Sequence, residues 1–327
     1  MKTTAIILTA VLVSGSAARA DWDPNNPLVP QQSTNHKMHW PQMPDLTLNG
    51  LDVLAGPIAY PAGSGEPYEK FLADDWGCTQ TGPVTGIHIW GSYNEDIWLI
   101  DTAAGNLPYF SLVIYDNIPP GVGDIPYSRP GRPLWDAYVQ PRVERIYAEN
   151  IREGFYDPNQ DVGGIAPPFN GIIGQDTICV QYNFDFDPSV TDPFIQNEGD
   201  IYWLGVHHTF DLDNSGVVDL MDLNLLAAKS PGAFGWKTAE DPFDWHFEDD
   251  AVWTDVDTWN SNGHVVPSDT FPGSAPTRWN ELRYPFGHPY EGMSMDLAFV
   301  ITPEPGTMAL LGLGGALALI RRHRRAM

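Results

Sequence analysis

The sequence predicts an all-β protein, an antiparallel β-sandwich of the jelly-roll type with long loops and a small loop-helix insert. Short runs of β-branched and aromatic residues recur along the chain, which is typical of strands. The chain contains 31 glycines and 30 prolines, many of them between these runs, and patterns with a helical period are nearly absent. Because closely spaced strands without crossover helices pair antiparallel, we expect two facing antiparallel sheets.

The first segment of the chain, Met1–Ala20, is predicted to be a secretory signal peptide. It has a cationic start at Lys2, an apolar core over Ala5–Val13 and the small-residue site Ala18-Arg19-Ala20. The alternative is an N-terminal membrane anchor, which needs an apolar run of about 20 residues. The observed run is about half that length, so cleavage before Asp21 is expected.

An extended arm is predicted over Asp21–Asp45, which is rich in Pro, Asn and Gln and has no sustained period. The sandwich domain is expected over residues 46–302, because no linker divides this stretch. Five runs in it have the length and composition of strands: Val84–Trp90, Tyr109–Tyr115, Thr177–Phe186, Ile201–His208 and Met293–Ile301.

The run Thr177–Phe186 alternates most clearly. Ile178, Val180, Tyr182, Phe184 and Phe186 alternate with Cys179, Gln181, Asn183 and Asp185. Since successive strand residues point to opposite faces, we expect one face in the core and the other in water.

A calcium loop of the EF-hand type is predicted at residues 211–222, DLDNSGVVDLMD. Such a loop places oxygen ligands at positions 1, 3, 5, 7, 9 and 12, with a glycine at position 6 and a backbone carbonyl from position 7. Gly216 occupies the sixth position. The predicted ligands to Ca²⁺ are Asp211, Asp213, Ser215, Val217, Asp219 and Asp222. The alternative is an acidic turn that binds no ion.

The segment that follows, DLNLLAAKSPG, favours a short helix that stops at Ser-Pro-Gly. A loop followed by a helix, with no entering helix, resembles a dockerin repeat. Dockerins have two repeats and this chain has one, so the resemblance implies calcium binding and not the binding of a cohesin partner. The predicted insert spans residues 210–234, and its ion would order it and take no part in catalysis.

Two cysteines, Cys78 and Cys179, are predicted to form a disulfide, because export leads to a compartment where disulfides persist and no C-x-x-C spacing offers a competing use. The alternative is a pair of free structural thiols.

The C-terminal segment, residues 303–327, begins with Pro303, Glu304 and Pro305 and continues through an apolar stretch over Met308–Ile320 to a cluster of arginines. These three parts in this order resemble the PEP-CTERM sorting signal of exported bacterial proteins. The resemblance implies a transient anchor in the membrane and a membrane-embedded sorting enzyme that cuts near the triplet. A permanent C-terminal anchor is the alternative.

Several segments of the domain, among them LADDWGCTQTGPVTGIHIWGSY, YSRPGRPLWD, FGWKTAED and ELRYPFGHPYEGMSMDLAFVI, resemble an uncharacterised domain of exported bacterial proteins. The resemblance covers roughly residues 45–302. It implies an architecture and a destination at the cell surface or outside the cell, and it implies no activity.

The charge balance excludes nucleic acid as a partner. The chain has 42 acidic and 17 basic residues and a formal net charge of −25. Six of the basic residues lie in the two terminal segments, so the domain between them has a net charge of about −30, which repels phosphate backbones.

Catalytic motifs are absent from the sequence: there is no G-x-S-x-G elbow, no H-E-x-x-H helix and no P-loop. His207 and His208 are adjacent on a predicted strand and point to opposite faces, so they cannot easily share a metal ion. The cluster around His246 lies in an acidic loop and is interpreted as solvated.

The aromatic residues leave one alternative open. Trp90 and Trp203 lie in predicted strands and are expected in the core. Trp245, Trp253 and Trp259 lie near acidic side chains and could contact a sugar. The expected function is therefore that of a non-enzymatic exported cell-surface or extracellular-matrix protein with a structural calcium site. The alternatives are a carbohydrate-binding module that binds extracellular polysaccharide, or a glycoside-active enzyme.

Overall fold

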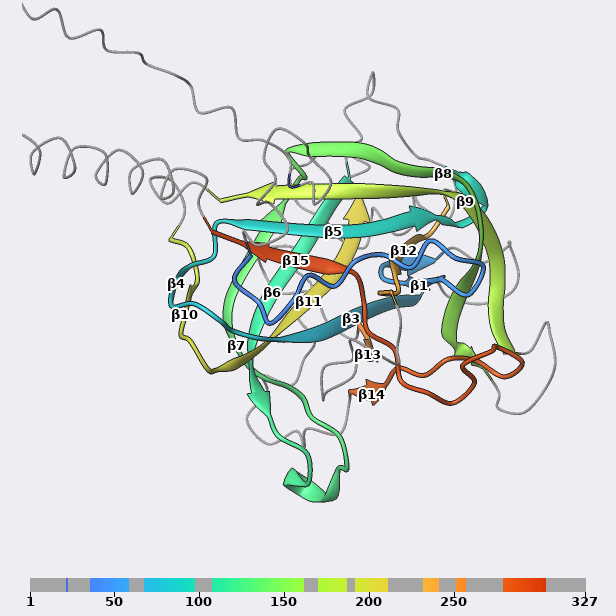
Figure 1. Cartoon of the computed structure of the whole chain (residues 1–327). Helices are drawn as coiled ribbons and strands as arrows, with labels where there is room; N and C mark the ends of the chain where they lie inside the picture. Colours follow the sequence, from blue (N-terminus) through green and yellow to red (C-terminus); the bar gives the residue numbers. More distant parts are fainter. Residues whose placement is uncertain are drawn as a thin grey trace, which may run out of the picture. The chain divides into compact units, whose positions relative to one another are not determined.

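Two β-sheets build the described part of the chain in this computed structural model (Figure 1). The structure describes residue 22 and residues 36–58, 68–97, 108–161, 170–186, 192–210, 232–240, 251–256 and 279–303. All of them belong to one compact unit, Trp22–Pro303. The predicted all-β sandwich is confirmed.

The first sheet has six strands. Their order is β12 (Phe234–Lys237), β1 (Leu51–Leu54), β8 (Val143–Asp161), β9 (Asn170–Asp185), β5 (Gly86–Tyr93) and β15 (Phe299–Thr302). Strand β12 also pairs with β5, so the pairings β12–β1–β8–β9–β5 return to β12 and form a closed circuit. Strands β1 and β8 pair parallel, which departs from the predicted antiparallel pattern, and the other described pairs of this sheet are antiparallel.

The second sheet has seven strands. Their order is β14 (Asn280–Glu281), β13 (Val252–Asp255), β3 (Tyr68–Gly77), β11 (Ile201–Phe210), β6 (Pro108–Ile118) and β7 (Arg129–Val139), and β2 (Pro57–Ile58) pairs with β3 off this path. A small pair joins β4 (Gly82–Pro83) to β10 (Ile195–Gln196). Two 3₁₀ turns, η2 (Asn94–Asp96) and η4 (Val122–Asp124), lie in connections. Among the described residues no helix is long and apolar enough to cross a membrane.

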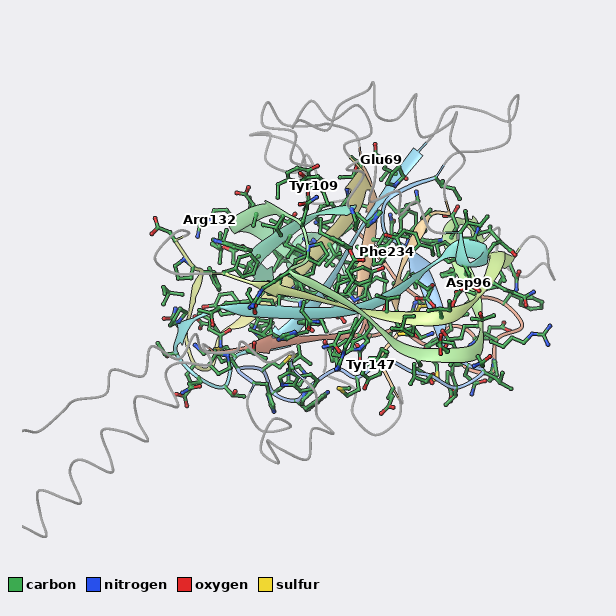
Figure 2. The ribbon with its side chains drawn as sticks, turned by 90° about the horizontal axis from the view of Figure 1, so that it is seen from above. Glu69, Asp96, Tyr109, Arg132, Tyr147 and Phe234 are labelled. Atoms are coloured by element: carbon green, nitrogen blue, oxygen red, sulfur yellow. The ribbon has the colours of Figure 1, made fainter. Side chains whose placement is uncertain are left out.

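The main core lies between the two sheets, and β6 and β11 of one sheet cross β5 and β15 of the other at a steep angle in Figure 1. Phe110 of β6 meets Tyr182 of β9 and Phe234 of β12 with ring centroids 5.2 Å apart in each case. Phe234 lies near the middle of the drawn side chains in Figure 2, whereas Arg132 lies near their border. Burial of each such large apolar side chain stabilises the fold by about 1.5–3 kcal/mol.

The outer face of β9 is not wet, and this expectation was wrong. Gln181 and Asn183 are both buried, and Trp22 of the predicted arm contacts Gln181. The Gln181 amide donates a hydrogen bond to the Trp22 carbonyl (2.9 Å) and another to the Asn183 side-chain oxygen (3.0 Å). His88 of β5 pairs with the same Asn183 oxygen at 2.5 Å. The two faces of the strand were predicted correctly. The polar face is nevertheless covered by a segment that is distant in the sequence, and its polar side chains form hydrogen bonds with one another.

A second apolar cluster covers the outer face of the seven-stranded sheet. Trp203 of β11 is fully buried there, as is Phe71 of β3, and Trp279 packs over the sheet from the segment before β14. Trp90 is also fully buried. The core positions predicted for Trp90 and Trp203 are confirmed.

The predicted strands match the observed ones with shifted ends. β9 begins at Asn170, seven residues before the predicted start, and β11 extends to Phe210. The run Met293–Ile301 is a strand only from Phe299, and before that point it forms isolated bridges at Ser294 and Leu297. The end of the predicted arm pairs with the domain at Met38, Gln42 and Pro44 through isolated bridges.

Candidate functional site

Most of the sites predicted from the sequence lie outside the described residues. This holds for the six calcium ligands, Asp211 to Asp222, and for Glu304 and Pro305 of the sorting triplet. It also holds for Trp245, Trp259 and the His246 cluster. Pro303 is described and directly follows β15. The calcium loop and the insert therefore stay predictions.

The predicted Cys78–Cys179 disulfide is wrong in this structure, since both cysteines are free and buried. Cys78 follows β3 of the seven-stranded sheet, and its thiol pairs with the Gln80 carbonyl at 3.4 Å. Cys179 lies in β9 of the other sheet, opposite Ala148. Each thiol has neighbours other than the second cysteine, so the even cysteine count did not imply a bridge. Burial raises the pKa of both thiols.

His207 and His208 point to opposite faces of β11, as predicted. His208 lies between the sheets, where its Nε2 pairs with the Tyr93 hydroxyl at 2.9 Å and its ring stacks on Phe234. His207 lies on the outer face, where its Nε2 is 2.7 Å from Glu69 Oε2 and its ring stacks on Phe71. The two imidazoles do not form a shared metal site.

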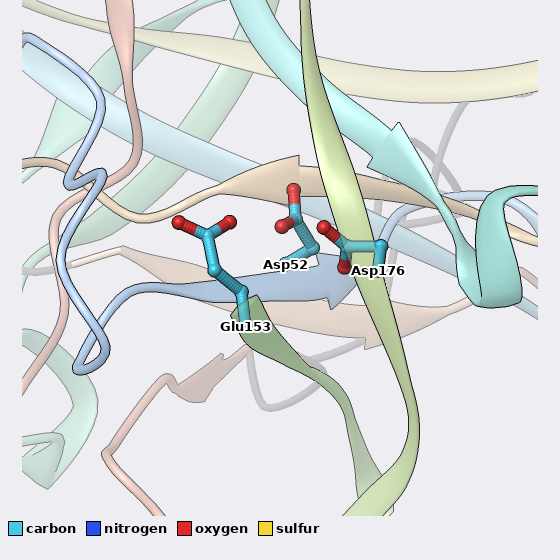
Figure 3. A group of neighbouring side chains, drawn as sticks. All are labelled: Asp52, Glu153 and Asp176. Atoms are coloured by element: carbon cyan, nitrogen blue, oxygen red, sulfur yellow. The ribbon is translucent and has the colours of Figure 1, made fainter. Parts of the chain in front are cut away.

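A buried cluster of ionisable side chains is the most unusual feature of the described chain. Lys237 lies among Asp52, Glu153 and Asp176, and the Lys237, Asp52 and Glu153 side chains are fully buried. Lys237 Nζ is 3.3 Å from Asp52 Oδ2, and it also contacts Glu153 Oε2. The ligand atoms of the three carboxylates lie within 4.8 Å of one another, and Figure 3 shows the three side chains pointing into one space.

The closed circuit of strands assembles this cluster, because each of its five strands contributes one residue. Asp52 comes from β1, Glu153 from β8 and Asp176 from β9, and Lys237 comes from β12. Ser92 of β5, fully buried, lies next to Asp176. Asp52 and Lys237 are direct register partners across the β1–β12 pair. The backbone hydrogen bonds of the circuit therefore hold all five side chains in place.

Electrostatics in this cluster favour neutral carboxyl groups. Burial raises the pKa of Glu153 to about 8 and that of Asp176 to about 10, and the nearby Asp52 carboxylate adds to both shifts. Burial lowers the pKa of Lys237, but the charges of Asp52 and Glu153 outweigh that effect and raise it. At neutral pH the Lys237 ammonium is thus the cation of the cluster, while Glu153 and Asp176 hold protons. Lys237 itself occupies the space among the carboxylates.

A shallow groove of about 470 Å³ is the second feature that a ligand could use. Trp135, Phe194 and Tyr202 supply aromatic surface there, and Asp192 and Asn197 supply polar groups. The Trp135 indole donates a hydrogen bond to the Asp192 carbonyl (3.1 Å), and its ring meets Phe186 edge to face at 5.0 Å. These contacts hold the half-buried Trp135 ring in one orientation.

Trp253, for which the sequence left sugar contact open as an alternative, contacts a lysine side chain. It is half-buried on β13, and Lys70 Nζ lies 4.8 Å from its ring centroid. Lys70 also forms an ion pair with Asp255. A cation over its face uses the surface on which a sugar would stack.

Sequence reasoning missed both the lysine–carboxylate cluster and the groove. The groove residues lie on segments far apart in the chain, so no local pattern unites them. One local signal did point to the cluster. Lys237 ends the run Phe234-Gly235-Trp236, in which every residue is buried. A lysine in such a run requires a buried anionic partner.

The C-terminal sorting segment marks an exported protein that is anchored through this segment and recognised by a membrane sorting enzyme, an exosortase. Residues 302–325 match the PEP-CTERM protein-sorting motif. The chain belongs to the family described as a domain of unknown function (DUF7901), which matches residues 38–302. No curated protein and no solved structure matches the chain.

Proposed function

We propose that the protein is a non-enzymatic component of the cell surface or extracellular matrix. One observation carries this proposal: the sorting motif starts at residue 302, the last residue of the buried strand β15. In the sequence, the match to the domain family ends at the residue where the match to the sorting motif begins. The clustered carboxyl groups of the described domain are buried within it, which supports a structural role for them.

Cell fractionation tests the destination. The intact chain should be found at the cell surface or in the matrix, with a C-terminus near Thr302. A variant with Pro303, Glu304 and Pro305 changed to alanine should stay in the membrane with its arginine cluster intact. A C-terminal peptide containing Arg321 from surface-extracted wild-type protein would contradict processing.

The absence of enzymatic activity is tested with extracellular polysaccharide as the substrate. No release of reducing sugar is expected from the purified protein. Release that disappears when one carboxylate is substituted would replace the proposal with a glycoside-active enzyme.

We propose a structural role for calcium at the loop Asp211–Asp222. The register of oxygen-bearing residues and Gly216 support it. With a dissociation constant of about 10⁻⁴ M, such a site stabilises the insert by about 1.4 kcal/mol at ~1 mM calcium. Calcium should therefore slow proteolysis within residues 210–234, and Asp211→Ala should remove that effect without unfolding the domain. Equal cleavage with and without calcium would show that the segment is an acidic turn that binds no ion.

A second candidate function, carbohydrate binding, is favoured by the groove at Trp135. Its fixed indole and neighbouring polar groups resemble the surfaces on which sugar rings stack, because a planar apolar face with flanking hydrogen-bond partners suits a pyranose. A glycan array with the wild-type protein and Trp135→Ala tests this role. Leu134→Ala, in the same groove, is the control that removes apolar surface without the stacking face. Binding that survives Trp135→Ala would place the sugar elsewhere.

A further inference from the structure

We propose that Lys237 and Asp52 join through a covalent amide bond between their side chains, formed by the folded protein itself with Glu153 as the proton shuttle. This inference is independent of the protein's role at the cell surface. It rests on the geometry of the three residues, on their burial and on the chemistry of an amine held against a carboxyl group.

The reacting groups are already in contact. Lys237 Nζ is 3.3 Å from Asp52 Oδ2, and the two residues are register partners on neighbouring antiparallel strands. Both side chains are fully buried. When two groups are fixed at such a distance, their effective concentration reaches about 10⁵–10⁸ M. That exceeds the concentration of water by orders of magnitude and favours condensation over hydrolysis.

Glu153 lies beside both members of the pair. Its Oε2 contacts the Lys237 ammonium, and the ligand atoms of the Glu153 and Asp52 carboxyl groups lie within 4.8 Å of each other. Burial raises the pKa of Glu153 to about 8, which lets its carboxyl group exchange protons near neutral pH. The Glu153 carboxyl group can therefore give a proton to an Asp52 oxygen and take one from Nζ.

The reaction balances without an oxidant or a second substrate. The Nζ lone pair, freed by proton transfer, attacks Cγ of Asp52 and forms the new N–C bond. One C–O bond of Asp52 breaks, and that oxygen leaves as water with two protons that came from the ammonium. The products are a neutral amide, one water and a Glu153 carboxyl group in its original protonation state.

The environment favours the product. A buried ion pair pays a desolvation cost that its mutual attraction only partly offsets, and a neutral amide does not pay it. The surroundings also fix the geometry: a Cβ added at Gly235 would lie 2.7 Å from Cβ of Asp52, and one added at Gly50 would lie 2.8 Å from Lys237 Nζ. Glycines at these two positions let the backbone close tightly over the reacting groups.

The molecule contains its own control. Lys70 is also fully buried and also contacts a carboxylate, that of Asp255. The Asp255 side chain is 53% exposed, however, so water solvates its charge and competes for the site. The proposal therefore predicts an amide at Lys237 and none at Lys70.

Tryptic digestion of the denatured, purified protein tests the proposal directly. Trypsin does not cut after an acylated lysine, so the bond should join the peptide 38–70 to the peptide 230–278, with the loss of one water. Cleavage after Lys70 should be normal. Recovery of peptide 230–237 and unlinked peptide 38–70 from the wild-type protein would overturn the proposal.

Four variants separate the roles. Asp52→Asn should still form the bond but lose ammonia, and it should give a linked peptide identical in mass to that of the wild type. Asp52→Ala and Lys237→Arg should give only unlinked peptides. Glu153→Gln, which preserves the shape of the side chain, should fold but show a much lower linked fraction. A cross-link that maps to Glu153 instead of Asp52, or full linkage in Glu153→Gln, would overturn the assignment of roles.

Discussion

His88 offers a direct measure of how much the covered polar face of β9 contributes to stability. The His88 side chain is buried, and burial lowers its pKa to about 4. Asn183 Oδ1 can only accept a hydrogen bond, so Nδ1 carries the proton and Nε2 is left to accept from the Thr302 hydroxyl at 3.1 Å. The folded protein therefore requires neutral His88.

The sign of the effect follows from the direction of the shift. The pKa of His88 is lower in the folded state than its ordinary value of 6.5, so the unfolded chain binds more protons between about pH 4 and 6.5. The stability contributed by neutral His88 is complete above pH 6.5 and is lost as the pH falls through this window. A shift from 6.5 to about 4 corresponds to about 3 kcal/mol.

The substitution His88→Gln removes the titrating group and keeps one donor and one acceptor. At pH 7 we expect the variant to be about 1 kcal/mol less stable, from imperfect hydrogen bonds. Near pH 4 we expect the variant to be about 2 kcal/mol more stable than the wild type. Only the wild type has a buried imidazole that must stay neutral in the folded state at a pH where it is protonated in the unfolded chain. Denaturant unfolding of both proteins across this pH range gives the difference directly.

The comparison between variants is necessary because other groups respond to pH in the opposite sense. The pKa values of Glu153 and Asp176 are raised, so their contributions to stability fall as the pH rises, and they would mask His88 in a single curve. His36→Gln is the control, since His36 is only half-buried and should show a smaller change. A constant gap between wild type and His88→Gln at every pH would refute the reasoning.

Three further predictions follow from the packing. Phe234→Ala should cost about 3–5 kcal/mol in chemical denaturation, because the Phe234 ring meets Phe110, Tyr182 and His208 at the centre of the core; a loss below 1 kcal/mol would contradict its central position. Gly205→Ala should cost about 1–3 kcal/mol, since a Cβ there would lie 2.5 Å from the Phe71 ring, whereas Gly199→Ala faces open space and should cost only about 1 kcal/mol of backbone strain from its positive φ. Both cysteines should resist alkylation in the native protein and both should react after denaturation without reductant; no mass increment after denaturation would indicate a disulfide.

The strands of the inner core were predictable because their pattern is local. Tyr182 and Phe184 in β9, and Leu204 and Val206 in β11, face the opposite sheet as period-2 alternation requires. Strand β8 was missed, because its sequence VERIYAENIREGFYDPNQD is rich in charged residues and its apolar positions do not alternate regularly. Its pairing with β9 shifts register four times, which disrupts the pattern that would identify a strand.

Whether a polar strand face is exposed or buried was not predictable, because this depends on segments that are far away in the chain. Trp22 lies more than 150 residues before Gln181 in the sequence, yet its carbonyl accepts a hydrogen bond from the Gln181 amide. From the sequence alone, a strand face of Gln and Asn is as consistent with solvent as with a covered network. What covers a face is a property of the topology, and alternation reports only that there are two faces.

The lysine–carboxylate cluster was also not predictable from the sequence as a whole, but one part of it was. A lysine that ends the buried run Phe234-Gly235-Trp236 implies a buried anionic partner, since an unpaired ammonium in an apolar interior would lose its proton or unfold the strand. The sequence thus requires a partner without naming it, because the chain has 42 acidic residues. Only the pairing of β12 with β1 selects Asp52, and only the pairing of β1 with β8 brings Glu153 beside it. For a site built from one residue of each of five strands, the sequence therefore predicts only that the buried lysine has an anionic partner. The partner and the chemistry of the site can be identified only when the pairing of the strands is known.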